Sequence, residues 1–235
     1  MNGPWDDPRV SAGLKRQFAM RRRMLAAGAR SVGWKVGFGA PASLALMQIT
    51  APLLGFITDS TVLESGATVA ATGWDRGIVE FEVAVRLGQD LGPGSSAAQS
   101  RDAVSAVGPA IELANVDLQV AATGVEEIVA GDIFHVGVIY GAMDADRAGL
   151  DITGLVARIL IDGVERAATA DLQATTGDYA RIVTTVADTL AANGETLRAG
   201  DTIITGSVIP PIPVTEGREF TFALEPFEPI SVHIG

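Results

Sequence analysis

The segment Val79-Glu80-Phe81-Glu82-Val83-Ala84-Val85 decides how the rest of this chain is interpreted. Its apolar and acidic residues alternate, which predicts a β-strand. Successive side chains of a strand point to opposite faces, so Glu80 and Glu82 share one face. Two neighbouring carboxylates repel each other and need a counter-charge in partly buried surroundings, which a divalent cation would supply. The alternative is a solvent-exposed strand face that carries two ordinary acids.

The composition describes a folded, acidic chain of 235 residues. Hydrophobic residues make up 48% and charged residues 19%, which is typical of a globular protein. We find no internal repeat and no low-complexity linker, so a single mixed α+β domain is the simplest interpretation. The formal net charge of −11 disfavours nucleic acid as a partner, because nucleic-acid binders normally need a basic face.

Membrane and secretory signals are absent from the sequence pattern. No apolar run reaches the length of a membrane span, so we expect no membrane partner. Residues 1–7 lack a basic start followed by an apolar core, so we expect no secretory signal. The chain has no cysteine, which excludes disulfides, thiolate metal sites and a cysteine nucleophile, and fits a cytoplasmic enzyme.

The hydrophobic patterns predict both helices and strands, with a run of strands around one helix in the second half of the chain. An N-terminal helical segment is expected over 1–30, and Asp162-Gly163 is a hairpin signal. Beyond that segment we predict helices over 41–48, 97–107 and 179–193, and strands over 31–37, 54–60, 79–85, 108–114, 155–161, 201–207, 220–224 and 230–234.

Four further residues are candidates for chemistry, each with an ordinary alternative. Lys35 stands among apolar residues and glycines, so it is either a lysine with an exposed head or a desolvated lysine with a lowered pKa. Glu112 lies in an apolar run behind Pro109, so it is either exposed at an edge or a ligand. Asp59 could cap a turn, and His135 is most simply a hydrogen-bonded core or surface histidine.

Five blocks of sequence carry a resemblance to a known family. They are Gly33-Trp34-Lys35-Val36-Gly37, Gly55-Phe56-Ile57-Thr58-Asp59-Ser60, Glu80-Phe81-Glu82, Pro109-Ala110-Ile111-Glu112 and Gly200-Asp201-Thr202-Ile203-Ile204-Thr205-Gly206-Ser207. Their order and content resemble the fumarylacetoacetate hydrolase superfamily, in particular its branch of 2-keto-4-pentenoate (2-hydroxypentadienoate) hydratases and 4-oxalocrotonate decarboxylases. The resemblance runs from about residue 30 to the end of the chain.

This resemblance implies a fold and a metal site. The fold is a mixed, mainly antiparallel β-roll or sandwich with a few flanking helices, in a catalytic domain over 31–235. Glu80, Glu82 and Glu112 are implied to bind Mg²⁺ or Mn²⁺, which suits cations that prefer oxygen ligands. Lys35 would then rebalance the charge of the site, and Lys35 and Asp59 are the implied proton-transfer residues.

The resemblance also implies a substrate and a reaction. The substrate is a small anionic 2-oxo or 2-hydroxydienoic acid, and Thr205, Gly206, Ser207 and His135 are the implied substrate-binding residues. The metal would stabilise an enolate, to which water is added in a hydratase. A homo-oligomer is expected from the resemblance alone.

Several alternatives stay open at this point. The same enolate chemistry serves decarboxylation of a 2-oxo-3-enedioate or a biosynthetic cyclisation. Carbon–carbon hydrolysis of an acylpyruvate would need a general base, and His135 is the plausible histidine for it. A protein of another class, a catalytically silent small-acid-binding protein, would keep the metal site without turnover.

The chain departs from the family pattern at four places. Trp34 replaces an arginine, and Gly39-Ala40 replaces a Thr-Ser pair. Asn115-Val116-Asp117 replaces Asp-Ser-Arg, and Thr176-Gly177-Asp178-Tyr179 replaces a Gly-His-Pro-like turn. We therefore predict that the substrate pocket differs from that of the named enzymes more than the metal ligands do.

Overall fold

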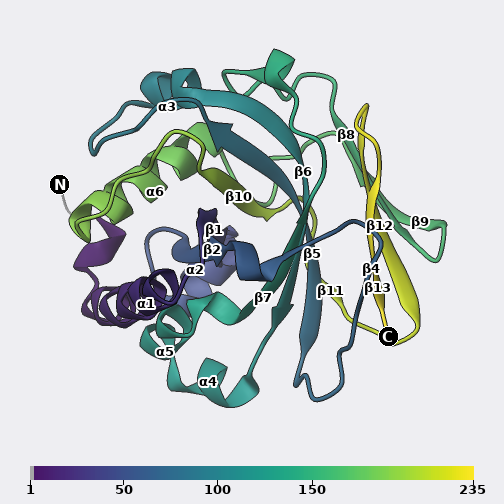
Figure 1. Ribbon diagram of the computed structural model, residues 1–235, viewed down its shortest axis with the longest axis horizontal. Helices are drawn as coiled ribbons and strands as arrows, with labels where there is room; N and C mark the ends of the chain where they lie inside the picture. The colour runs from purple at the N-terminus through teal and green to yellow at the C-terminus, as the bar shows by residue number, and fades with distance from the viewer. Residues whose placement is uncertain (1–2) are drawn as a thin grey trace.

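The computed structural model describes residues 3–235, which form two β-sheets with helices against them (Figure 1). Figure 1 shows most helices on one side and the smaller sheet on the other. Among the described helices, none combines the length and apolarity needed to cross a membrane. The helices are α1 (Pro8–Ala26), α2 (Pro41–Met47), α3 (Ala97–Ala103), α4 (Leu118–Thr123), α5 (Val125–Ala130) and α6 (Tyr179–Ala192), with 3-10 turns η1 (Pro4–Asp6), η2 (Asp59–Thr61), η3 (Asp132–Phe134) and η4 (Ala145–Arg147).

The larger sheet has eight strands and the smaller has five. The larger sheet contains β1 (Ser31–Gly37), β2 (Leu53–Thr58), β3 (Val62–Leu63), β5 (Gly77–Leu87), β6 (Val104–Asn115), β7 (His135–Tyr140), β10 (Thr202–Ser207) and β11 (Ile212–Pro213). The smaller contains β4 (Ala67–Val69), β8 (Val156–Ile161), β9 (Val164–Thr169), β12 (Arg218–Glu225) and β13 (Ile230–Ile234).

Most strand pairs are antiparallel, as the sequence predicts. The larger sheet runs β2-β1-β10-β5-β6-β7-β3, with β11 beside β5, and the smaller runs β4-β13-β12-β8-β9. The pairs β1–β10, β3–β7 and β4–β13 are parallel. The two sheets meet at aromatic side chains, since the rings of Phe81 on β5 and Phe222 on β12 are 5.6 Å apart. The predicted mixed, mainly antiparallel α+β class is confirmed.

The N-terminal helix α1 packs into the same hydrophobic core as the strands. Its residues Val10, Leu14 and Phe18 are buried in that core. The buried amide of Gln17 donates to the carbonyl oxygens of Leu54 (2.9 Å) and Val129 (2.8 Å). Helix α1 therefore stabilises the strands that follow it.

One predicted helix is wrong in its second half. The sequence predicts a helix over 97–107, but α3 ends at Ala103 and β6 begins at Val104. Val104 and Val107 pair with Leu87 and Val85 of β5. Valine is stiff at its β-carbon and favours strands, so the pairing with β5 ends the helix.

We expect the core contact of α1 to dominate the stability of this region. Leu14 is 0% exposed and Leu46 on α2 is 82% exposed. Leu14→Ala should lower the free energy of unfolding by about 2–5 kcal/mol, because it leaves a cavity. The matched control Leu46→Ala should change it by less than about 0.5 kcal/mol. Urea denaturation measures both, and equal effects would contradict the packing of α1 in the core.

Candidate metal centre

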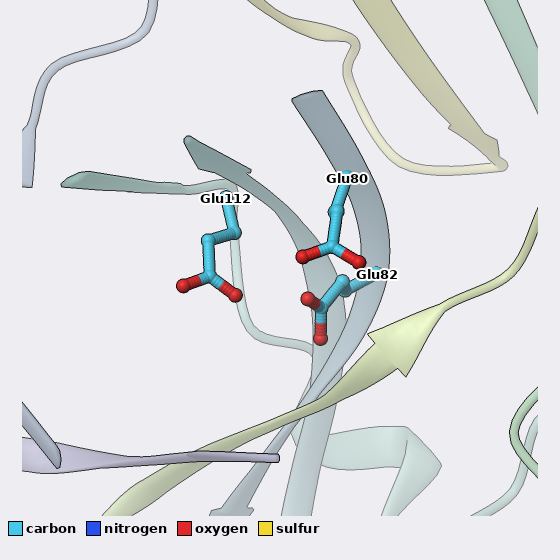
Figure 2. A group of neighbouring side chains, drawn as sticks. All are labelled: Glu80, Glu82 and Glu112. Carbon is cyan, nitrogen blue, oxygen red and sulfur yellow. The ribbon is translucent and has the colours of Figure 1, made fainter. Parts of the chain in front are cut away.

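Strands β5 and β6 bring three glutamates together. Glu80 and Glu82 share a face of β5, and Glu112 of β6 pairs in register with Glu80. One carboxylate oxygen from each of the three lies within 4.8 Å of the others, as Figure 2 shows. Glu82 and Glu112 are fully buried. Among the described residues, Glu82 Oε1 and Glu112 Oε2 have no hydrogen-bond partner.

Burial and mutual repulsion change how these carboxyl groups ionise. Burial and the neighbouring charge of Glu112 raise the pKa of Glu80 to about 7. The same causes raise the pKa of Glu82 well above its ordinary value. Burial also acts to raise the pKa of Glu112, but Lys35 and a hydrogen bond from His135 outweigh it and lower that pKa. The donor set is therefore oxygen-only and electron-rich, which fits a hard divalent cation.

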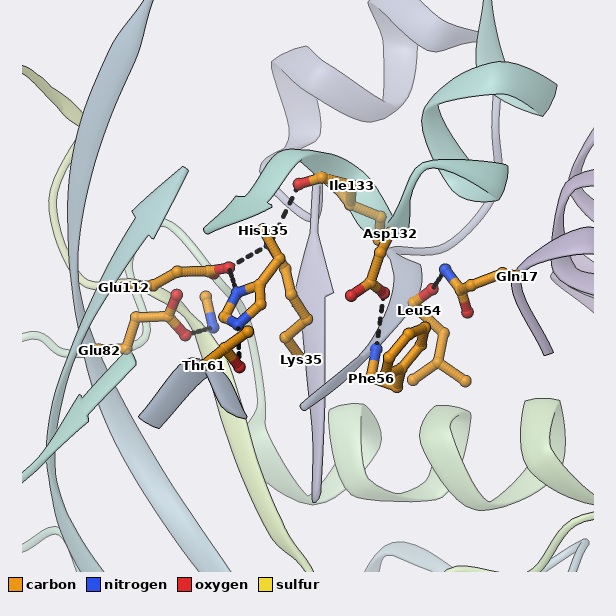
Figure 3. A network of polar contacts seen from close by, with 11 residues as sticks. Gln17, Lys35, Leu54, Phe56, Thr61, Glu82, Glu112, Asp132, Ile133 and His135 are labelled. Carbon is orange, nitrogen blue, oxygen red and sulfur yellow. Dashed lines mark hydrogen bonds and ion pairs between the residues drawn. The ribbon is translucent and has the colours of Figure 1, made fainter. Parts of the chain in front are cut away.

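Lys35 on β1 is buried against the glutamates. It pairs with Ile204 of β10, which pairs with Ala84 of β5, so Lys35 shares the face of the glutamates. Its Nζ donates to the carboxylate of Glu112 and to the carbonyl oxygen of Ile133 (3.1 Å). Figure 3 shows this network. Position 55 on β2 requires glycine, because a Cβ there would lie 2.6 Å from Lys35 Cγ.

The prediction of a lysine with a lowered pKa is wrong for this structure. Burial acts to lower the pKa of Lys35, but the charges of Glu112 and Glu80 outweigh it. The pKa of Lys35 therefore lies above its ordinary value, and the ammonium is the counter-charge of the glutamates. The alternative of an exposed lysine head is also wrong, since the residue is 1% exposed.

His135 holds Glu112 in place. Its Nδ1 donates to Glu112 Oε1 (2.7 Å), and its Nε2 is hydrogen-bonded to the Thr61 hydroxyl (3.0 Å) (Figure 3). Both ring nitrogens therefore have partners, as expected for a hydrogen-bonded core histidine. The geometry makes His135 a positioning residue for Glu112, and its role in substrate binding stays a prediction.

Asp132 is a buried acid near Lys35 that was not predicted as a site residue. It is buried in η3, and its Oδ1 accepts from the backbone N–H of Phe56 (2.8 Å). Burial raises its pKa to about 8. The backbone of Asp132, Ile133 and Phe134 is left-handed (φ 58°, 54° and 63°), which is strained for residues other than glycine. This turn directs the Ile133 carbonyl to Lys35, and a lone acid after Gly131 in an apolar run was the available sequence signal.

The carboxylate of Asp59 is paired with Arg30, and Asp59 is not part of the glutamate group. Its carboxylate accepts from the Arg30 backbone N–H (2.9 Å) and from Arg30 Nε (2.8 Å). These hydrogen bonds lower the pKa of Asp59. They fix the chain between α1 and β1, which agrees with a turn-capping role. Proton transfer by Asp59 rests on the resemblance alone.

A pocket of about 260 Å³ lies beside the glutamates, and Glu80, Thr205, Gly206 and Ser207 line it. The Gly206 N–H donates to Glu82 Oε2 (2.6 Å), from a backbone with φ 96° that favours glycine. The Thr205 hydroxyl donates to a β5 carbonyl (2.9 Å), and Ser207 Oγ accepts from a β5 N–H (3.1 Å). These residues therefore anchor β5 at the pocket wall, and their contact with substrate stays a prediction.

Only some of the positions at which the chain departs from the family pattern lie in this pocket. The Gly39-Ala40 turn and Thr176 line it. Trp34 points to the opposite face of β1, where its indole N–H donates to Asp201 (3.1 Å). Asn115-Val116-Asp117 joins β6 to α4 and caps that helix. The replacement of the family arginine by Trp34 therefore affects the core behind the sheet.

Comparison with known proteins agrees with this geometry. The family described as Fumarylacetoacetate (FAA) hydrolase C-terminal matches residues 35–234. The chain belongs to this family. A 2-hydroxyhexa-2,4-dienoate hydratase of Comamonas testosteroni is 29% identical over 209 residues, 88% of this chain and 79% of the relative. A 4-oxalocrotonate decarboxylase of Pseudomonas sp. (strain CF600) is 30% identical over 208 residues, 87% of this chain and 78% of the relative.

Solved structures show the same fold. The 4-oxalocrotonate decarboxylase from Pseudomonas putida G7, complexed with magnesium and adipate, superimposes with a TM-score of 0.84 at 24% identity, over 96% of this chain and 86% of that chain. Fumarylpyruvate hydrolase from Pseudomonas aeruginosa, in complex with Mn²⁺ and pyruvate, gives 0.69 at 16% identity, over 87% of this chain and 89% of that chain. The predicted family and fold are confirmed.

The raised pKa values predict that the metal-free protein loses stability as pH rises. The folded-state pKa is about 7 for Glu80 and about 8 for Asp132, against ordinary values of 4.5 and 3.8. Between the ordinary and the raised values the folded state holds protons that the unfolded state releases, so the free energy of unfolding falls as pH rises. Urea denaturation with a chelator, from about pH 5 to about pH 8, should show this fall.

Matched variants identify the groups responsible. Glu82→Gln removes a buried carboxyl whose own pKa is raised, and should make the fall with pH shallower, because the folded state then holds one proton fewer that the unfolded state releases. The control Glu64→Gln removes an exposed carboxyl and should leave the profile unchanged. A stability that rises steadily over the same range would contradict the raised pKa values.

Proposed function

We propose that this chain is a divalent-metal-dependent lyase that hydrates a small 2-hydroxydienoic acid through its 2-oxo form. The observation that supports this most is the convergence of three carboxyl groups, two of them with buried unpartnered oxygens, beside a buried ammonium. The relatives named as a hydratase and a decarboxylase act within the same class of chemistry, and they are 29% and 30% identical to this chain.

Glu80, Glu82 and Glu112 would hold the metal, which we propose is Mg²⁺ or Mn²⁺. Related solved structures carry magnesium or Mn²⁺. When bound, such an ion supplies Lewis acidity that stabilises negative charge on a 2-oxo acid. Gly206 fixes one oxygen of Glu82 and His135 fixes one oxygen of Glu112, so the unpartnered oxygen of each carboxylate is left to face the ion.

Lys35 is the proposed proton-transfer residue. In the metal-free protein the charges of Glu112 and Glu80 raise the pKa of Lys35, so its amine stays protonated. If a divalent charge offset the same carboxylates, Lys35 would lose part of this stabilisation and its proton would be easier to transfer. The Ile133 carbonyl accepts a hydrogen bond from Nζ and helps to hold it beside Glu112. Asp59 stays a second proton-transfer candidate on the resemblance alone.

Decarboxylation of a 2-oxo-3-enedioate is the second candidate, because a relative named for that reaction is 30% identical to this chain. Hydrolysis of an acylpyruvate has less support. Its general base would be His135, but both ring nitrogens of His135 are already hydrogen-bonded, to Glu112 and to Thr61. We also propose, on the resemblance and the absence of cysteine, a homo-oligomer located in the cytoplasm.

Turnover of a six-carbon dienoate tests the proposal. With Mg²⁺, the purified protein should consume 2-hydroxyhexa-2,4-dienoate, followed as loss of dienol absorbance without release of CO₂. Lys35→Met should lower kcat by about 10²–10⁴-fold, the usual contribution of a positioned proton donor. The control Lys15→Met changes an exposed lysine of α1 and should leave kcat unchanged.

Two results would decide against hydration. Release of CO₂ from an enedioate, without hydration of any dienoate, would favour the decarboxylase. Full activity of Lys35→Met would remove Lys35 from the mechanism.

A further inference from the structure

The pocket beside the glutamates has walls that are largely apolar. Glu80 and Gly206, which binds Glu82, place the acidic cluster at one part of the wall. Phe38, Ile182 and Pro210 are among the residues that form the rest. A 2-oxo acid whose acid end lies at the glutamates must therefore place its carbon chain among apolar side chains.

The lining offers no positive charge to a second carboxylate. Of the described residues that line the pocket, Glu80 is the charged one, and none is a lysine, arginine or histidine. The nearby ammonium of Lys35 is bound to Glu112 and does not line the pocket. A carboxylate moved from water into this pocket would lose its hydration without gaining a counter-ion, which is strongly unfavourable.

The hydroxyl groups of the wall compensate little for this. The Thr205 hydroxyl donates to the Val83 carbonyl, and the Thr175 hydroxyl donates to the Ser207 carbonyl. Ser43 on α2 adds a neutral hydroxyl that supplies no charge.

Gly39 and Ala40 also line the pocket, and neither brings a polar side chain to its wall.

We propose that the pocket selects 2-oxo acids whose far end is an uncharged hydrocarbon, over dicarboxylic acids of the same length. This inference rests on the proposed function, because it requires the 2-oxo end to lie at the glutamates. It separates two reactions found among the relatives. Hydration of a monocarboxylic dienoate leaves an apolar far end, whereas decarboxylation of an enedioate starts from a charged one. The wall composition favours the first.

A matched pair of ligands tests the selection directly. Both 2-oxohexanoate and 2-oxoadipate have six carbons, and they differ in the far carboxylate. Calorimetric titration of the Mg²⁺-loaded protein should show that 2-oxohexanoate binds at least about tenfold more tightly, since one unpaired buried charge costs this much or more. Equal or tighter binding of 2-oxoadipate would overturn the inference.

A charge placed in the wall should reverse the preference. Ser43→Lys puts a cation on α2, at a partly exposed position that tolerates a longer side chain. It should strengthen 2-oxoadipate binding by at least about tenfold, while the uncharged control Ser43→Met should not. If Ser43→Lys and Ser43→Met bind 2-oxoadipate equally, charge does not govern selection and the inference is wrong.

Oxalate separates failure of this inference from failure of the proposed function. It carries no chain beyond its two carboxylates and tests the glutamate end alone. Oxalate binding together with equal binding of the six-carbon pair overturns the selection and leaves the proposed function standing. Absence of binding by oxalate and by both six-carbon acids overturns both.

Discussion

The protein depends on one electrostatic constraint, which is that three carboxyl groups lie together, two of them fully buried and the third, Glu80, in the wall of the pocket. Lys35 and His135 offset part of the cost at Glu112, and the Gly206 N–H offsets part of it at Glu82. The part of the burial cost that these groups do not offset raises the pKa values of Glu80 and Glu82. A buried arrangement of this kind is unfavourable as a purely structural device, and a divalent cation removes the cost.

The two faces of β5 connect this constraint to the fold. On one face Phe81 packs against Phe222 of the smaller sheet, and on the other Glu80 and Glu82 face the site. Shifting β5 by one residue would exchange the faces, so the core packing also fixes the position of the carboxylates. Helix α1 also stabilises this arrangement. The side-chain amide of Gln17 donates to the carbonyl of Leu54 on β2, the strand that pairs with the strand carrying Lys35. Stability and the geometry of the site therefore rest on the same strand pairings.

The sequence predicted features that depend on local period or on a recognised motif. Alternation placed Glu80 and Glu82 on one face, and the resemblance supplied Glu112 and the mainly antiparallel fold. The features that it missed depend on contacts distant in the chain. The pKa of Lys35 is raised by Glu112, a residue 77 positions away, and no local pattern shows that contact. Asp132 entered the site through a strained left-handed turn that its sequence does not favour.

The most direct test of the account is calorimetric titration of the metal-free protein with Mg²⁺ at about pH 6.5, in two buffers with different ionisation enthalpies. We expect one bound ion per chain with release of protons, because the pKa of Glu80 is about 7 and its proton must leave for the metal to bind. Glu82→Gln should lose the binding, whereas the exposed control Glu64→Gln should keep it. Absence of binding, or undiminished binding by Glu82→Gln, would contradict the claim that the three glutamates form a metal site.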